Sequence, residues 1–279
     1  MSDPSEYHIR AEKDQQLAID CLAEGTGISK QKLKLAMQKG CVWLEKSGSG
    51  KQYTQRLRRA KKPLTEGETL HLYYDPSVLN AIPPTATLIS DEGAYSIWNK
   101  PSGMLSQGSK WGDHCTIYRW AEQHLQPERP GFIVHRLDRA ANGLIVIAHK
   151  KQVAAQFSKL FEEHALEKHY RATVAGDFSK IMTDDVLSIR EPIDDKPACS
   201  HVRVLSYDSV QDESTLDVLI ESGRKHQIRK HLSGAGYPII GDRLYGKAER
   251  LDERDLQLSA HSLSFTCPVT GDEKSFELS

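Results

Sequence analysis

The amino-acid sequence predicts a mixed α/β (α+β) protein of two domains, the larger of which is built around a largely antiparallel sheet. The chain has 279 residues, and at about 150 residues per domain this length corresponds to two domains. Short β-branched runs alternate with segments of helical period. A stretch without a clear period, which carries Pro83-Pro84, separates a short N-terminal part from the rest. We therefore predict a small domain over residues 1–75, a linker over 76–93 and a large domain over 94–279.

Composition and cysteine usage narrow the class of protein. Hydrophobic residues make up 38% of the chain and charged residues 27%, which is enough apolar sequence for a core. No apolar run approaches the ~20 residues that a membrane-spanning helix needs, and the first residues lack the pattern of a signal peptide. The five cysteines are scattered without C-x-x-C spacing, which argues against a disulfide framework or a zinc knuckle. We expect a cytoplasmic protein in a reducing compartment.

Positive charge is concentrated near the N-terminus. Residues 28–62 hold eleven Lys or Arg and one acid, Glu45, a local net charge of +10 on a chain whose formal net charge is −1. A basic block on a nearly neutral protein is typical of a surface that binds a polyanion. The alternative is an ordinary solvated helix face followed by a loop.

The small domain is expected to contain two short helices and three strands. Asp14 is a candidate N-cap for the first helix, and Gly40 stands where a helix C-terminus favours glycine. The expected elements are, in order, a strand at Glu6–Arg10, a helix after Asp14, a helix at Lys30–Lys39, a strand at Cys41–Leu44, a turn at Lys46–Lys51 and a strand ending at Tyr74. This layout resembles the α-L-type RNA-binding domain of a ribosomal small-subunit protein. The resemblance implies that the second helix faces RNA through Lys30, Lys32, Lys34 and Lys39.

The large domain is organised around the stretch from Gly131 to Ala148. Phe132–Val134 and Leu144–Ala148 are short β-branched runs that predict buried strands. Between them Asp138 stands close to two arginines, and Asn142-Gly143 gives a turn signal. A carboxylate in such a connection is costly to place and is therefore a candidate functional residue.

The remaining elements of the large domain are predicted from the spacing of apolar residues and from the Gly and Pro residues that end each run. Alternating apolar residues predict strands, and an apolar stripe at helical spacing predicts an amphipathic helix. The expected elements are a strand and turn at Tyr95–Gly103, helices at Thr116–Glu122 and Lys151–Glu163, and strands at Lys168–Gly176, Thr215–Ile220 and Leu258–Phe265.

Four ordered motifs in the large domain resemble those of the RluA-type pseudouridine synthases. They are His135-Arg136-Leu137-Asp138 with Gly143-Leu144, Lys168-x-Tyr170-x-Ala172, Gly223-Arg224-Lys225-His226-Gln227-Ile228-Arg229, and Gly241-Asp242-x-x-Tyr245-Gly246. The chain departs from the family pattern at Ala141-Asn142, where Thr-Ser is usual, and at Lys225, where Thr is usual. The resemblance extends from about Tyr95 to the C-terminus.

The resemblance implies an isomerase that converts uridine to pseudouridine in structured RNA, either rRNA or tRNA, and that acts as a monomer. It names Asp138, Tyr170 and Arg224 as catalytic residues, with Arg224 keeping the aspartate ionised. Arg136 would fill the space left by a flipped uridine, while Gln227 and Arg229 would contact RNA. Because the reaction is an isomerisation within RNA, no cofactor and no metal are expected. The sequence also lacks a P-loop and a dinucleotide fingerprint.

Several alternatives stay open at this point. Asp138 fits either a nucleophile at the anomeric carbon or a base at the neighbouring ribose carbon. A non-catalytic RNA-binding or ribosome-assembly factor on the same fold is a second reading, since fold does not guarantee activity. A hydrolase that uses Asp138 and His135 is a third, and the absence of a nucleophile elbow argues against it.

Overall fold

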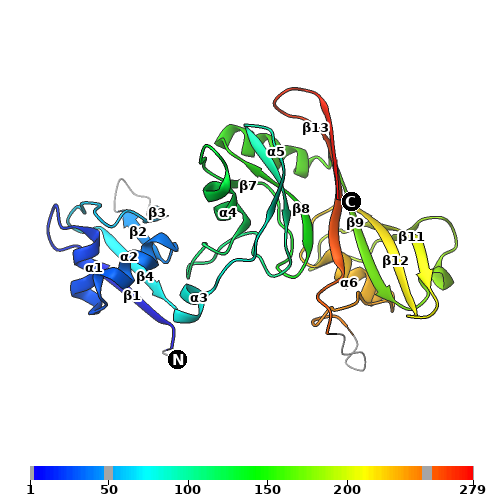
Figure 1. Cartoon of the computed structure of the whole chain (residues 1–279), viewed down its shortest axis with the longest axis horizontal. Coiled ribbons are helices and arrows are strands. Elements are labelled where there is room, and N and C mark those ends of the chain that lie inside the picture. Colours follow the sequence, from blue (N-terminus) through cyan, green and yellow to red (C-terminus); the bar gives the residue numbers. More distant parts are fainter. Residues whose placement is uncertain (1–2, 47–52, 247–252, 279) are drawn as a thin grey trace. The chain divides into compact units, whose positions relative to one another are not determined.

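The computed structural model describes residues 3–46, 53–246 and 253–278, and it forms two compact units (Figure 1). The first unit comprises Met1–Pro83 and Gln107–Trp120, and the second comprises Pro84–Ser106 and Ala121–Ser279. Most of the turn expected at Lys46–Lys51 lies outside the described residues. Within the described ranges, no helix is long and apolar enough to cross a membrane.

The first unit is a four-stranded antiparallel sheet with two helices packed on it. The strand order is β1-β4-β2-β3, and the helices bury Leu22 and Leu33 in one core together with Leu44 and Leu72 of the strands. The elements are β1 (Ser5–Arg10), α1 (Ala18–Thr26), α2 (Lys30–Gln38), β2 (Val42–Lys46), β3 (Tyr53–Arg56), β4 (Thr69–Tyr74) and α3 (Pro76–Asn80).

Two local expectations for this unit were wrong. Helix α1 begins at Ala18, with Leu17 at the N-cap position and no side-chain cap. The Asp14 carboxylate instead accepts a hydrogen bond from the backbone N–H of Glu66, 2.9 Å away, and so joins two loops. Strand β3 was not expected, because its sequence is polar; it pairs with β2 along the edge of the sheet.

The segment Gln107–Trp120 packs on this sheet through a buried carboxylate. The Asp113 side chain is completely buried and lies 2.5 Å from Arg58 Nη2 and 3.3 Å from Arg56 Nε. Gly40, whose φ is +80°, leaves room for these groups, because a Cβ there would lie 2.3 Å from Asp113 Oδ1. The stretch expected to be a linker contains α3, which is capped by Asp75, and the units divide at Pro83.

The second unit is a mixed sheet in which nearly every pair of neighbouring strands is antiparallel. The order is β10-β11-β12-β9-β13-β8-β6-β5, with β14 on β13 and β7 on β8; the β8–β13 pair is parallel. Figure 1 shows β8, β13, β9, β12 and β11 side by side. The elements are β5 (Thr87–Asp91), β6 (Tyr95–Lys100), β7 (Phe132–Ile133), β8 (Asn142–Ala148), α5 (Lys151–Glu162), β9 (Leu166–Ala175), η1 (Phe178–Ile181), β10 (Leu187–Ile189), β11 (Ser200–Asp208), β12 (Glu213–Ile220), α6 (Gln227–Gly234), β13 (Leu258–Thr266) and β14 (Glu273–Glu277). Helix α4 (Ile117–His124) begins in the first unit and ends in the second. The predicted mixed, largely antiparallel class is confirmed.

The prediction of a turn at Asn142-Gly143 was also wrong, and the reason lies in how two strands pack. Both residues lie inside β8, which begins at Asn142. A Cβ on Gly143 would lie 2.4 Å from the backbone N and O of Ala260, so glycine allows β8 to approach β13. The chain therefore passes from Asp138 directly into a buried strand, and this fixes one end of the segment that carries the carboxylate.

Candidate active site

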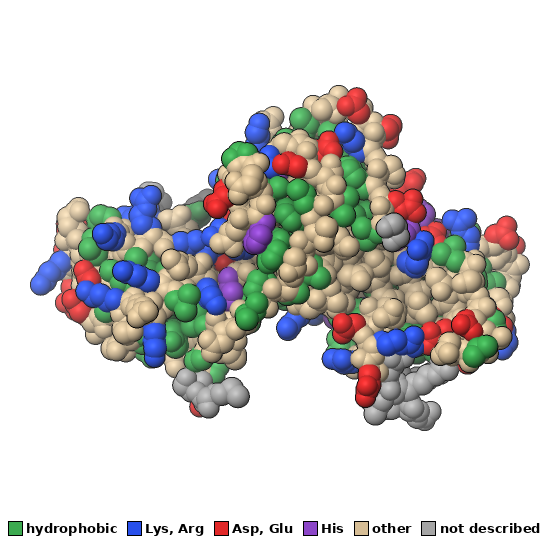
Figure 2. All heavy atoms as spheres, viewed as in Figure 1, with side chains coloured by type: hydrophobic (Ala, Val, Ile, Leu, Met, Phe, Trp, Pro, Cys, Tyr) green, Lys and Arg blue, Asp and Glu red, His purple; other side chains and the backbone are tan. Residues whose placement is uncertain are grey.

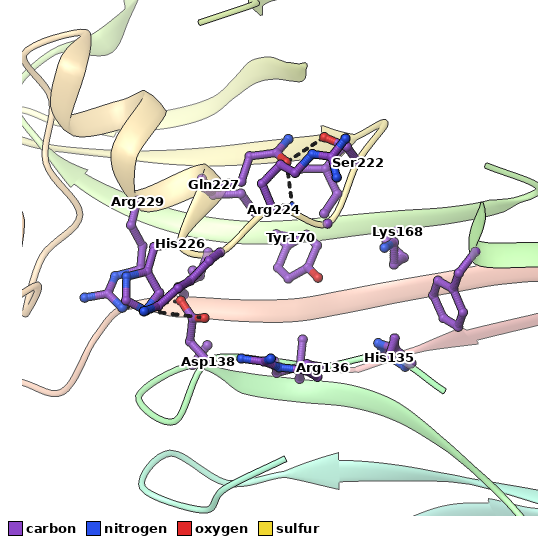
Figure 3. Close-up of a pocket in the computed structure, with 18 of the residues that line it drawn as sticks. His135, Arg136, Asp138, Lys168, Tyr170, Ser222, Arg224, His226, Gln227 and Arg229 are labelled. Atoms are coloured by element: carbon purple, nitrogen blue, oxygen red, sulfur yellow. Dashed lines mark hydrogen bonds and ion pairs between the residues drawn. The ribbon is translucent and has the colours of Figure 1, made fainter. Parts of the chain in front are cut away.

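A pocket of about 720 Å³ lies in the second unit and contains most of the residues singled out in the sequence. One wall is the segment between β7 and β8, a second is β9, and a third is the connection from β12 into α6 (Figure 3). These three segments are far apart in the sequence, and the sheet brings them together because β9 pairs with both β12 and β13.

Asp138 offers a partly accessible carboxylate at one end of this pocket. Its side chain is 22% exposed, and its Oδ2 accepts a hydrogen bond from Arg229 Nη1, 3.3 Å away. His226 Nε2 lies 3.8 Å from Oδ1. In Figure 3 both partners approach the carboxylate from the α6 side, which leaves its other side facing the pocket. A carboxylate with one open side can react with a bound molecule.

The arginine beside Asp138 is Arg229, and the expectation that Arg224 holds this position was wrong. Arg224 is exposed, and its Nε donates to the carbonyl of Pro197, 3.2 Å away. The reason is geometric: Arg224 stands in the turn before α6, whereas Arg229 is on the helix and points toward Asp138 (Figure 3).

Arg229 is itself held by a second carboxylate, Asp242. Its Nε and Nη2 donate to the two Asp242 oxygens at 2.8 and 2.7 Å, and the Asp242 side chain is only 1% exposed. Burial acts to raise the pKa of Asp242, but the hydrogen bonds from Arg229 and from two backbone N–H groups outweigh it and hold that pKa below its ordinary value. A bidentate pair of this kind fixes the guanidinium, so Arg229, which was expected to contact RNA, is held between two carboxylates of the protein.

Gln227 was also expected to contact RNA, but in this structure its polar atoms are bonded within the protein. The side chain is 4% exposed. Its Oε1 accepts from Ser222 Oγ and from the Arg224 backbone N–H, at 2.8 and 3.1 Å, while its Nε2 donates to the Cys199 carbonyl at 2.8 Å. Gln227 therefore shapes the turn that leads into α6.

Tyr170 lies in the middle of the pocket on β9. It is 7% exposed, and Figure 3 shows its ring between the Asp138 wall and the Arg224 wall. Burial and then the charge of Asp138 raise the pKa of the Tyr170 hydroxyl, so the group is a neutral phenol at physiological pH. The Tyr170 ring lines the pocket beside the carboxylate, where an aromatic ring can pack against a planar base.

The wall that carries Asp138 also presents Arg136 and His135. Arg136 is exposed and lines the pocket. His135 Nε2 accepts a hydrogen bond from the Val146 backbone N–H, 3.0 Å away, and its ring lies 4.5 Å from that of Phe161. Burial and then Lys168 lower the pKa of His135 to about 3. A neutral histidine whose acceptor nitrogen is engaged argues against the hydrolase reading.

Two pocket residues were given no role from the sequence. Lys168 lies two residues before Tyr170 on β9, so both side chains face the pocket; the Lys-x-Tyr spacing could have indicated this. Burial lowers the pKa of Lys168 to about 8, and its Nζ lies 4.9 Å from the centre of the Phe161 ring. The second is His226, which lies close to Asp138 and whose Nδ1 lies 2.9 Å from Tyr245 Oη.

Buried groups hold the segment around Asp138 from behind. Lys100 is fully buried, and its Nζ donates to the carbonyls of Ala141, Met104 and Pro101 at 2.6, 3.0 and 3.0 Å. Ser106 Oγ accepts from the backbone N–H of Leu137 and donates to its carbonyl, at 3.0 and 2.7 Å. Lys100, in the turn predicted at the end of the Tyr95–Gly103 segment, therefore helps to hold the segment that carries Asp138 in place.

Lys100 provides a test of this anchoring by pH. Burial lowers its pKa from 10.5 to about 8, so between these values the unfolded chain binds more protons than the folded chain. Stability should therefore rise with pH in this window, by at most about 3 kcal/mol. We expect the difference in free energy of unfolding between wild type and Lys100→Met to move in favour of wild type from pH 7.5 to 10, as measured by urea denaturation. A constant difference would show that Lys100 does not titrate in this range.

The four lysines of the first unit are not equivalent. Lys30 pairs with Asp20 at 2.7 Å, and Lys39 is half-buried and donates to the carbonyl of Leu79. Lys32 and Lys34 are exposed on α2. Figure 2 shows many Lys and Arg side chains on the face of this unit that it draws.

This chain is similar to a known protein family, to related sequences and to solved structures. Residues 94–234 match the family described as RNA pseudouridylate synthase. An uncharacterized RNA pseudouridine synthase of Chloroflexus aurantiacus is 34% identical over 212 residues, which cover 70% of this chain and 66% of that protein. The matched part is thus just under two thirds of that relative's length.

Two further relatives are named for particular RNAs. The ribosomal large subunit pseudouridine synthase D of Zymomonas mobilis is 27% identical, and the match covers 70% of this chain and 68% of that protein. The tRNA pseudouridine synthase C of Vibrio parahaemolyticus is 30% identical, and the match covers 63% of this chain and 82% of that protein. Among solved structures, Human RNA Pseudouridylate Synthase Domain Containing 1 matches with a TM-score of 0.59 at 19% identity, over 71% of this chain and 86% of that one. This last likeness concerns the fold.

Proposed function

Because the chain belongs to the RNA pseudouridylate synthase family, a family of isomerases that act on RNA, we propose that it converts uridine to pseudouridine in rRNA or tRNA. The observation that carries this proposal is the Asp138 carboxylate, which is paired with Arg229 on one side and open to the pocket on the other. The reaction breaks the bond between N1 of uracil and C1′ of ribose and forms a bond from C5 to C1′. N1 gains a proton and C5 loses one, so no redox partner is required.

Asp138 supplies the negative charge that the reaction needs. It can attack C1′ as a nucleophile or remove a proton from C2′, and both routes require the ionised form. The guanidinium of Arg229 places a positive charge beside this carboxylate, and Asp242 holds it within hydrogen-bonding distance. We therefore assign this task to Arg229 and not to Arg224.

Tyr170 and Arg136 act on the base and on the space that it leaves. The Tyr170 ring would pack on the uracil beside Asp138, with the neutral hydroxyl as a hydrogen-bond donor. A uridine inside a helix must leave its stack to enter the pocket, at a cost of a few kcal/mol. Arg136 is exposed on the same wall, and its planar guanidinium would offset part of this cost by stacking in the vacated position.

The first test is direct. Purified protein is incubated with tRNA and rRNA transcripts without added cofactor, and the RNA is digested to nucleosides for chromatography. Pseudouridine should appear in the same amount as uridine disappears. RNA binding without pseudouridine would favour the non-catalytic RNA-binding or assembly factor.

The first unit is proposed to bind the RNA backbone. Removing it by truncation is a poor test, because Asp113 on the segment 107–120 would lose Arg56 and Arg58. We instead expect Lys32→Gln with Lys34→Gln to weaken binding and to lower the salt slope by about 0.7 to 0.9 for each phosphate that the variant no longer neutralises. Turnover at saturating RNA should hardly change, since both lysines lie outside the pocket.

The matched control for these lysines is Lys151→Gln, which removes one exposed charge from α5 of the second unit. Binding is measured by filter retention across a range of KCl concentrations. An unchanged slope in the double variant would identify α2 as an ordinary solvated surface.

We also propose an oligomeric state and a cellular compartment for the protein. The protein is proposed to act as a monomer. None of the five cysteines, all of which lie in the described ranges, is in a disulfide, which supports a reducing compartment such as the cytoplasm.

A further inference from the structure

We propose that Cys199, His201 and Glu221 form a binding site for one Zn²⁺ ion next to the pocket. Cys199 directly precedes β11, His201 is the second residue of β11, and Glu221 directly follows β12. These two strands are paired, and the Glu221 backbone N–H donates to the Cys199 carbonyl at 3.2 Å. One ligand atom from each side chain lies within 4.8 Å of the other two.

The spacing of the three ligand atoms fits a tetrahedral ion. Zn–S, Zn–N and Zn–O bonds of about 2.3, 2.0 and 2.1 Å at tetrahedral angles place sulfur about 3.5 Å and oxygen about 3.4 Å from the ring nitrogen. The distance from Cys199 Sγ to His201 Nε2 is 3.5 Å. The distance from Nε2 to Glu221 Oε1 is 2.6 Å, so the carboxylate must move outward by less than about 1 Å. It is free to do so, because the Glu221 side chain is 51% exposed.

The histidine is oriented as a metal ligand is. Its Nδ1 lies 2.8 Å from Ser188 Oγ, and a hydrogen bond there fixes the ring and leaves the Nε2 lone pair for a metal. The same arrangement argues against a Cys–His–Glu nucleophile system. In such a system the thiol and the acid contact different ring nitrogens, whereas here Cys199 and Glu221 both contact Nε2.

Charge and ligand type select the ion. A thiolate and a carboxylate together balance the charge of one divalent cation. Thiolate and imidazole ligands favour Zn²⁺ over Mg²⁺ or Ca²⁺, which prefer oxygen. Three protein ligands leave the fourth position to water. The sequence showed no sign of this site, because His201 and Glu221 are 20 residues apart and meet only through strand pairing.

The ion would lie directly behind one wall of the pocket. Ser222, the residue after Glu221, and Gln227 both line the pocket, and Gln227 donates to the Cys199 carbonyl. Bound Zn²⁺ would fasten the start of β11 to the end of β12, and so hold the turn that contains Arg224. The site is separate from Asp138, and its test does not depend on the isomerase activity.

The test is metal binding by the full chain, with Co²⁺ as a coloured substitute for Zn²⁺. We expect uptake of one ion per chain, an absorption band from sulfur-to-cobalt charge transfer, and displacement of Co²⁺ by Zn²⁺. Cys199→Ser should remove the charge-transfer band. Cys115→Ser, which removes a partly exposed thiol of the first unit, is the matched control and should leave the band unchanged.

A second set of variants guards against effects on folding. Glu221→Gln and His201→Asn change side chains at least 23% exposed, so both variants should melt close to wild type while binding Zn²⁺ at least about tenfold more weakly. Ser188→Ala should weaken binding by about tenfold through the ring orientation. No uptake at micromolar Zn²⁺, or a charge-transfer band that survives Cys199→Ser, would overturn the proposal.

Discussion

Asp138→Asn should lower turnover at least about 10³-fold while leaving RNA affinity nearly unchanged. The substitution keeps the size of the side chain and removes the charge that either chemical route requires. Affinity is expected to persist because it is dominated by contacts to phosphates. Asp138 is 22% exposed and has Arg229 as a partner, so its replacement leaves that arginine with Asp242. Folding should therefore be preserved.

The measurement is single-turnover formation of pseudouridine at saturating RNA, with binding measured on the same RNA. Asp194→Asn is the matched control, because Asp194 is exposed and pairs with Lys230 at 2.9 Å outside the pocket. It should retain wild-type turnover. If Asp138→Asn keeps more than a tenth of the activity, Asp138 is not the reacting carboxylate.

Arg229→Met should reduce both activity and stability. The guanidinium contacts Asp138 and is held by Asp242, whose side chain is 1% exposed. Its loss leaves a buried carboxylate without its partner, which costs about 3–5 kcal/mol, and removes the positive charge beside Asp138. We expect turnover to fall about 10²–10³-fold, by analogy with the loss of one stabilising donor in other active sites.

The two effects can be separated with a second variant. Arg229→Met combined with Asp242→Asn removes the unpaired charge and should recover much of the free energy of unfolding, as measured by urea denaturation. Turnover should remain low, since Asp138 still lacks its arginine. Arg224→Met should cost less activity than Arg229→Met, because Arg224 donates to a backbone carbonyl at Pro197. The reverse order of the two arginine variants would restore Arg224 as the partner of Asp138.

Most of the fold was predictable because it rests on local patterns. The apolar run at 144–148 and the alternation at 170–174 predicted β8 and β9, and the helical period after Lys151 predicted α5. The failures have a common cause. Asp14 and Gly143 carry the ordinary signals of a helix cap and a turn, yet contacts with Glu66 and Ala260 use them differently. Local preferences are weak when a distant part of the chain competes for the same group.

The sequence by itself determined which residues are candidates for the chemistry, since Asp138, Tyr170 and the basic segment before α6 can be found from their motifs. It did not determine which arginine contacts the carboxylate. Arg224 and Arg229 are five residues apart, and a strand-to-helix turn sends one to the surface and the other to Asp138. Only the tertiary structure decided this, because the direction of a side chain after a turn depends on how the following helix packs. The same reason explains why Lys100 could be read as a turn residue and is in fact the buried anchor of the segment that holds Asp138.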